Sequence, residues 1–253
     1  MTYPNPHFLA QYGTDAHRDK LAQSTSEPSF GIALAKHGND SHRDNLVNHP
    51  SERVRTYVAR YGNNSQHDKM VSDPHPDIRC EVARVGTHAH RDQLVNDEND
   101  DVRAAVAKHG TDAHRDALVD DYHPHVRNTV AEHGNPEQLS KVLDYATQYP
   151  KHYGRALEVG ATKGTSKEKD AVARAIYDKP YHLSTKHALL KHGTIKHAFW
   201  LSRDDNMDVK NKSHEILKPY GGKDMTKDML EKHGETPIAN KTESVLSIAR
   251  KLV

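Results

Sequence analysis

The chain has 253 residues, enough for one or two domains, but only 34% are hydrophobic and 6% aromatic, and the formal net charge is +1. So little apolar material argues against one thick core, such as that of a barrel, and favours a thin, extended core. No apolar run reaches the roughly 20 residues of a membrane span, and the single cysteine, Cys80, excludes an internal disulfide and a cysteine-based metal site.

The small net charge hides a division between two segments. Residues 1–134 carry a formal charge of −5, and most of their basic residues are arginine; residues 135–253 carry +6, and most are lysine. This division predicts two segments with different surfaces. The nearly neutral total argues against a dedicated nucleic-acid-binding protein and leaves open a local basic patch in the second segment.

A repeat of about 24 residues runs through the first segment. A helical stretch such as VRAAVAKHG is followed by a block such as TDAHRDAL, so one unit reads as helix, glycine, short helix and turn. The glycine is expected to end the first helix in a left-handed conformation. The marker glycines, at spacings of 25 and then 24, are Gly13, Gly38, Gly62, Gly86, Gly110 and Gly134.

The residue after each glycine is a Thr or an Asn, the types that cap a helix N-terminus. Apolar residues in the longer helix recur on one face, and another lies eight residues after the glycine on the short helix. Each unit therefore offers only a few apolar side chains and can bury them only against the neighbouring units. The predicted core positions are Val54, Val58, Ala59, Ile78, Val82, Ala83, Val102, Val106, Ala107, Val126, Val130, Ala131, Leu21, Leu46, Met70, Leu94 and Leu118.

The pattern L-V-x-D-x-x-x-x-V-R-x-x-V-A-x-H-G over residues 5–134 resembles the leucine-rich-variant repeat, a relative of HEAT and armadillo repeats. That resemblance implies short and longer helices alternating along a right-handed superhelix. Some proteins of this type carry an iron–sulfur cluster in a separate cysteine-rich segment. This chain lacks those cysteines, so the cluster is not expected here.

Beyond residue 134 the period lengthens to 29 or 30 residues, marked by Gly164, Gly193 and Gly222, and longer helices of the HEAT kind are expected. The resulting prediction is an all-α, right-handed α-solenoid, with 24-residue units over 1–134 and longer units over 135–253 in one continuous superhelix. A terminal helix is expected to close it, carrying Val245, Leu246, Ile248, Ala249 and Leu252.

The triplet His-Arg-Asp occurs once in most units and resembles part of the kinase catalytic loop, but the other kinase motifs are missing. A structural ladder is the favoured interpretation. We expect the repeated Asp to pair with the repeated Arg of the longer helices. The Asp are Asp19, Asp44, Asp68, Asp92, Asp116, Asp170 and Asp228, and the Arg are Arg55, Arg79, Arg103 and Arg127.

The 21 histidines raise the question of a metal site, but they show no ligand pattern with a third donor. Those directly before a helix-ending glycine are expected to cover terminal carbonyls and to complement the helix dipole. We therefore expect no metal and no cofactor. This group comprises His37, His109, His133, His192 and His233.

The first hypothesis for function is a non-enzymatic binding or scaffold protein in the cytoplasm that holds another protein or self-associates. The alternatives are a nucleic-acid-binding HEAT-like protein of the DNA-glycosylase kind, acting through the basic second segment, and a structural subunit of a larger assembly such as a virion. No membrane contact is expected. Candidate partner-binding residues are Arg55, Arg79, Arg103, Arg127, Phe199, Trp200, Lys163, Lys167, Lys169 and Arg174.

Overall fold

The computed structural model describes residues 6–23, 27–222 and 225–238. Contacts divide the chain into two compact units, Met1–Val126 and Arg127–Val253. Within the described ranges every regular element is a helix, apart from one antiparallel β-bridge between Thr194 and Pro237. The all-α solenoid predicted from the repeats is confirmed.

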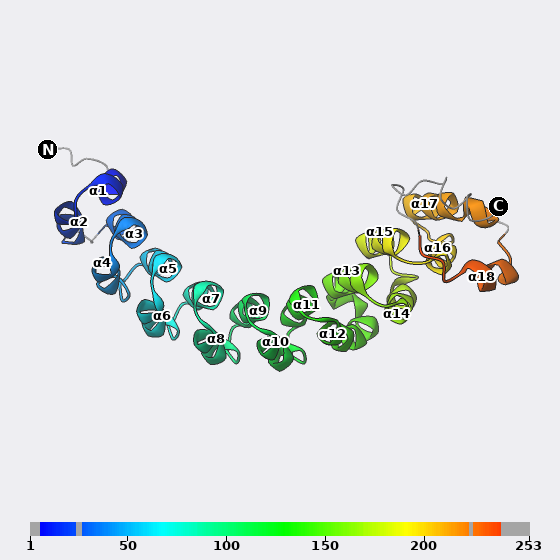
Figure 1. Cartoon of the computed structure of the whole chain (residues 1–253), viewed down its shortest axis with the longest axis horizontal. Helices are drawn as coiled ribbons and strands as arrows, with labels where there is room; N and C mark the ends of the chain where they lie inside the picture. The colour runs from blue at the N-terminus through cyan, green and yellow to red at the C-terminus, as the bar shows by residue number, and fades with distance from the viewer. Residues whose placement is uncertain (1–5, 24–26, 223–224, 239–253) are drawn as a thin grey trace. The chain divides into compact units, whose positions relative to one another are not determined.

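In the first unit, consecutive first helices of the repeats pack against one another, and each second helix packs on its own first helix (Figure 1). The helix α11 (Pro124–His133) begins in this unit and ends in the second. The first helices are α1 (Pro6–Tyr12), α3 (Pro28–His37), α5 (Glu52–Tyr61), α7 (Pro76–Val85) and α9 (Asp100–His109); the second helices are α2 (Asp15–Ala22), α4 (Asp40–Asp44), α6 (Asn64–Met70), α8 (His88–Leu94) and α10 (Asp112–Leu118).

The core of the first unit consists of the residues that the helical period predicts. In α5 the buried residues are Val54, Val58 and Ala59, and in α6 Met70 closes the layer from the other side. All the predicted core positions are buried. Because each repeat contributes so few apolar side chains, burial depends on the neighbouring repeats.

Two second helices of the second unit are longer than those of the first unit, whereas α16 has 7 residues although its repeat also has the longer period. Both α12, with 13 residues, and α14, with 11, exceed the 7 residues of α6, α8 and α10. The predicted terminal helix lies outside the described residues. The elements are α12 (Pro136–Gln148), η1 (Pro150–His152), α13 (Gly154–Lys163), α14 (Ser166–Ile176), α15 (Leu183–His192), α16 (Ile195–Leu201), α17 (Met207–Leu217), η2 (Lys218–Tyr220) and α18 (Lys227–His233).

Each second helix of the first unit starts with a capping box in which the third helical residue is His or Gln. In α8, the backbone N–H of Thr87 donates to Nδ1 of His90 at 2.9 Å. Because a backbone N–H only donates, this Nδ1 carries no proton, and the imidazole proton is on Nε2. The neutral histidine therefore caps the helix as a glutamine would.

The opposite side of the same imidazole connects neighbouring repeats. His90 donates from Nε2 to Oδ1 of Asp68 in α6 at 2.8 Å, and His42 reaches Asp19 in the same way at 3.0 Å. Gln66 replaces the imidazole: its Oε1 accepts from the N–H of the capping Asn63 at 2.7 Å, and its Nε2 donates to Asp44 at 3.2 Å. His and Gln thus form the same joint between repeats.

The left-handed conformation predicted for the repeated glycines is wrong. Gly86 and Gly110 have extended backbones, with φ of −71° and −83°. Glycine is required by space, because a Cβ at Gly110 would lie 2.5 Å from the carbonyl oxygen of Val106 and 2.9 Å from Cβ of His114. Among the described residues, positive φ occurs only at Gly221 (102°) and Gly222 (57°), which follow η2.

Candidate binding groove

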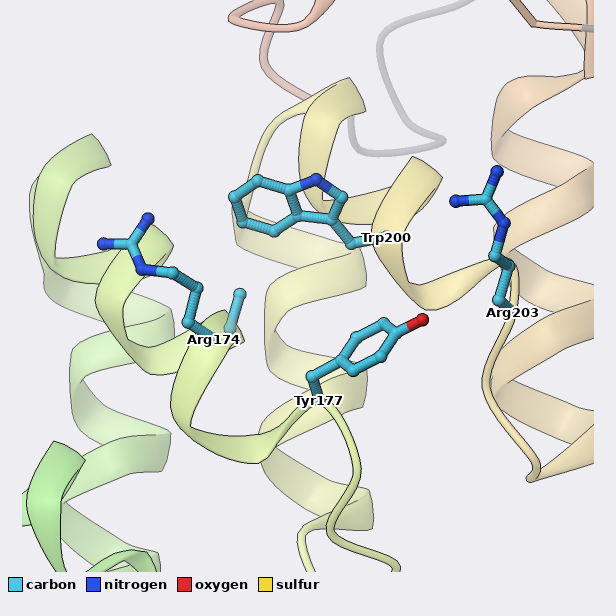
Figure 2. Close-up of a pocket in the computed structure, with 5 residues that line it drawn as sticks. Arg174, Tyr177, Trp200 and Arg203 are labelled. Atoms are coloured by element: carbon cyan, nitrogen blue, oxygen red, sulfur yellow. The ribbon is translucent and has the colours of Figure 1, made fainter.

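A groove of about 300 Å³ opens on the surface of the second unit where α14 packs beside α16. In Figure 2 the aromatic side chains Trp200 and Tyr177 lie between the guanidinium groups of Arg174 and Arg203, and the Tyr177 hydroxyl points toward Arg203. The fifth lining residue is Ala173, which is buried. The groove therefore combines two flat aromatic surfaces with two cations.

The joint between repeats holds Trp200 in place. The ring of Trp200 meets the fully buried ring of His197 edge to face, with centroids 5.8 Å apart. Nδ1 of His197 accepts from the backbone N–H of the capping Thr194 at 2.8 Å, and Nε2 lies 2.9 Å from Oδ1 of Asp170 in α14. Burial lowers the pKa of His197, so the imidazole is neutral. The hydrogen-bonded imidazole ring holds the Trp200 indole in position.

Lys196 supports the indole from a second side. Its Nζ lies 5.7 Å from the centre of the Trp200 ring and also contacts Asp170 at 2.8 Å and Glu235 at 2.5 Å. A cation at this distance from an indole is attracted to the ring. The indole is thus supported on α16 while remaining partly exposed to the groove.

The two arginines of the groove have no charged partner among the described residues. Both are exposed, and neither side chain forms an ion pair or hydrogen bond with another described residue. Arg203 lies over the ring of Phe199, with Cζ 4.8 Å from its centre. Guanidinium groups bind carboxylates and phosphates through paired hydrogen bonds. The groove is therefore chemically suited to an anionic ligand with an apolar or flat portion.

Comparisons with known proteins bear on the fold. No protein-family model and no curated protein matches the chain. A solved structure described as a leucine-rich repeat variant with a novel repetitive protein structural motif matches 82% of this chain and 84% of that chain, with a TM-score of 0.62 and 17% sequence identity. The chain has the leucine-rich-variant fold. The match is one of fold.

Inside the first unit, the repeated arginines of the leucine-rich-variant repeats form ion pairs with aspartates. Arg79 donates from Nε and Nη2 to the two carboxylate oxygens of Asp97 at 2.7 and 2.8 Å, and each side chain is only 8% exposed. The same pairing joins Arg55 to Asp73 and Arg103 to Asp121. These guanidinium groups hold the turn that follows the second helix.

The pairing predicted between these arginines and the repeated Asp of the second helices is therefore wrong. The Asp that pair with these arginines lie in the turns, while Asp68 accepts from His90 of the next repeat. The Arg of the His-Arg-Asp triplet also has a structural partner, since Arg91 donates from Nε to the carbonyl of Ala83 at the end of α7 at 2.7 Å. The triplet is thus built into the contacts between helices.

Arg127, the last of the series, has a different environment. Its Cζ lies 4.5 Å from the ring centre of Tyr145 and 5.1 Å from that of Tyr153. Tyr145 stands at the repeat position that Asp121 occupies one unit earlier. Further along the second unit, Lys186 and Asp204 form the equivalent ion pair at 2.6 Å, and both side chains are almost fully buried. This pair is not predicted from the sequence because lysine replaces arginine.

The groove brings together two of the predicted partner-binding residues, Arg174 and Trp200, with Phe199 beside them under Arg203. The lysines do not line it: Lys169 donates from Nζ to the carbonyl of His192 at 2.8 Å, and the exposed Lys163 and Lys167 lie at the end of α13 and the start of α14.

Sequence reasoning missed Tyr177 and Arg203. Arg203 could have been found from the period, because it lies ten residues after Gly193, as Arg174 lies ten residues after Gly164. No comparable signal marks Tyr177.

The lone cysteine, the metal-ligating residue types and the helix lengths bear on other kinds of site in the described part of the chain. Burial raises the pKa of the Cys80 thiol to about 12, so it is protonated at neutral pH and a poor nucleophile. The residues described contain no group of three or more His, Cys, Asp or Glu arranged to hold a metal ion. None of their helices is both long and apolar enough to cross a membrane.

Proposed function

We propose that the protein is a non-enzymatic binding protein that holds an acidic segment of another protein in the groove lined by Arg174, Tyr177, Trp200 and Arg203. The observation that carries the proposal is the pair of exposed arginines without ion-pair partners among the described residues, placed on either side of a supported indole. Trp, Tyr and Arg are the residue types that dominate binding energy at protein interfaces.

A binding role suits the chemistry of the groove better than catalysis. Its lining offers an indole, a phenol and two guanidinium groups, with no nucleophile beside a general base. Two cations also suit a peptide carboxylate better than a long polyphosphate chain, because nucleic acid is bound by rows of cations that neutralise many phosphates.

The single tryptophan provides the test. An N-acetylated, C-amidated peptide of glutamate, leucine and serine is titrated against the whole chain while Trp200 fluorescence is recorded. We expect saturable binding that weakens with added salt, since screening shortens charge attraction to about 10 Å at 0.1 M. We also expect a peptide with lysine in place of glutamate to bind at least ten times more weakly.

The matched control separates the groove from general charge. The double variant Arg174→Gln with Arg203→Gln is expected to lose binding, and a second double variant removes two exposed arginines elsewhere, Arg53→Gln with Arg84→Gln. Equal loss in both would show a nonspecific charge effect and contradict the proposal. No fluorescence change and no calorimetric binding with any acidic peptide would also contradict it.

A further inference from the structure

A second cavity, of about 570 Å³, opens in the second unit where α13 and α15 pack side by side. It lies at the N-terminal ends of both helices, because its lining includes Gly154, the first residue of α13, and Ser184, in the first turn of α15. The cavity shares no lining residue with the groove of Trp200.

Four of the first helices have an aspartate at this end of the repeat, three residues before the helix begins. In front of α7, the carboxylate of Asp73 accepts from the backbone N–H of His75 at 2.9 Å. A carboxylate placed here satisfies an open N–H group and complements the positive end of the helix dipole. The equivalent aspartates before α9, α11 and α17 are Asp97, Asp121 and Asp204.

This aspartate is missing before α13 and α15. Lys151 stands three residues before α13, and Pro180 three residues before α15. At α15 the backbone N–H groups of His182, Leu183 and Ser184 donate to no described residue, and the side chain of the capping residue makes no capping bond. A helix start with open donors and no carboxylate of its own is suited to an anion from outside the chain.

Two buried side chains at the start of α15 also lack partners. His182 lines the cavity and is 4% exposed; the carbonyl of Pro150 is near its ring, but Nε2 has no hydrogen-bond partner among the described residues. The Cε1–Nδ1 edge of the ring faces Gly154, where a Cβ would lie 3.9 Å from Cε1 and 4.0 Å from Nδ1. Thr185 is 1% exposed, and its Oγ1 has no described partner either. Because buried polar atoms normally have a partner, these two side chains favour a polar ligand at this place.

Lys151 gives the cavity a cation. Its side chain is exposed and forms no ion pair or hydrogen bond with another described residue. The other charged groups of the lining compensate each other, since Arg155 lies 3.7 Å from Glu158 and contacts Glu132 at 2.6 Å. The exposed hydroxyl of Ser184 adds a further donor. The cavity therefore offers a free ammonium group beside several neutral donors.

We propose that this cavity binds a phosphate ester at the start of α15, in the place that an aspartate of the chain takes before other first helices. The N–H groups of the first turn and the Ser184 hydroxyl donate to the phosphate oxygens, and the Lys151 ammonium pairs with their charge. The three terminal oxygens of a phosphate accept from this set of donors more fully than the two oxygens of a carboxylate. The site goes beyond the proposed function, which concerns the groove.

The experiment measures phosphate binding to the whole chain by calorimetry and by the melting temperature at constant ionic strength. The probes are inorganic phosphate, glycerol phosphate and an N-acetylated, C-amidated peptide with one phosphoserine. Acetate and the unphosphorylated peptide serve as controls. We expect the phosphate probes to raise the melting temperature, because a ligand of the folded state stabilises it, and the controls to have little effect. The ester that binds more tightly identifies the source as a small molecule or a protein segment.

Two variants test where the phosphate binds. Lys151→Gln should weaken binding about tenfold, as the loss of one charge-assisted hydrogen bond implies. Pro180→Asp returns the aspartate of the other repeats to the start of α15, and the phosphate-dependent rise in melting temperature should disappear. Lys163→Gln removes an exposed lysine at the opposite end of α13 and should leave binding unchanged.

Three results would overturn the proposal. The first is a parent protein whose melting temperature responds to none of the phosphate probes. The second is an equal response in the parent and in Pro180→Asp, and the third is a response to acetate as large as that to phosphate. Circular dichroism checks that each variant is folded. Acidic-peptide titrations followed by Trp200 fluorescence should be the same for Lys151→Gln and the parent, so this site and the groove are tested separately.

Discussion

At the end of each first helix, glycine is required because a Cβ would lie too close to neighbouring atoms, and not because of its backbone dihedral angles. The extended backbone of Gly110 is open to any amino acid, yet its N–H donates to the carbonyl of Val106 at 2.8 Å. That bond draws the chain so close to the helix end that a Cβ has no room. The next helix then starts immediately, since Thr111 is its cap.

Because space decides the residue here, we expect Gly110→Ala and Gly110→Asn to destabilise the protein to a similar extent, by about 1–3 kcal/mol, as overpacking generally does. A left-handed position would instead tolerate Asn better than Ala. Denaturant midpoints of the two variants decide between these explanations. Ala113→Val, which enlarges an exposed residue of the adjoining helix α10, serves as the control and should have a small effect.

At the scale of elements, the main contact between repeats is the joint between consecutive second helices. One side chain caps its own helix and holds the Asp of the preceding one, as His90 does with Thr87 and Asp68. Because Gln66 makes both bonds with its amide, the joint requires a neutral acceptor and a donor at fixed separation. It does not require a titratable group.

Replacing His90 by Gln is therefore expected to leave the denaturant midpoint nearly unchanged. His90→Leu should lower stability by about 1–3 kcal/mol, because the N–H of Thr87 loses its partner in a part-buried position. Equilibrium unfolding of both variants, followed by circular dichroism, measures the difference. Comparable losses in the two would show that the imidazole acts through packing against its neighbour His67, and the equivalence of His and Gln would fail.

The joint also shows where sequence reasoning succeeds and where it stops. Periodicity is sufficient for the helices, their N-terminal caps and the buried positions such as Val58 and Met70, because these depend on local pattern. Pairing between repeats depends on direction, and sequence spacing alone did not tell whether Asp68 faces an arginine or the next histidine. The sequence predicts only part of the groove. Trp200 stands out because it is the single tryptophan, whereas Tyr177 is relevant only because α14 and α16 lie side by side.

At the scale of the whole molecule, the abundance of histidine connects stability to pH. Burial lowers the pKa of His67 in the first unit and of His182 and His197 in the second, below the ordinary value of 6.5. Their neutral forms are favoured by folding, whereas the unfolded chain takes up protons at the ordinary value. The stability contributed by neutral histidine is therefore complete above about pH 6.5 and is lost as the pH falls through the lowered folded-state values.

We accordingly expect the melting temperature to fall progressively between about pH 6.5 and pH 5, before most carboxylates are protonated. His197→Gln should flatten this dependence, because a glutamine can cap α16 without binding a proton. Thermal melts across this range, for the parent and the variant, check the prediction. A parent melting temperature that is constant over the range would contradict it.

The joint that Gln66 and His90 share has a consequence for how such a chain changes length. A segment of 24 residues presents an Asp toward one neighbour and a His or Gln toward the other. The two sides of the segment therefore form the complementary parts of the same hydrogen-bonded joint, or connector. Deleting or duplicating such a cassette in the gene leaves no connector unmatched, and no compensating substitution is needed. Where the period lengthens, Ser140 takes the position of this Asp and Glu168 that of the next His or Gln, so a 24-residue segment no longer matches its neighbour there.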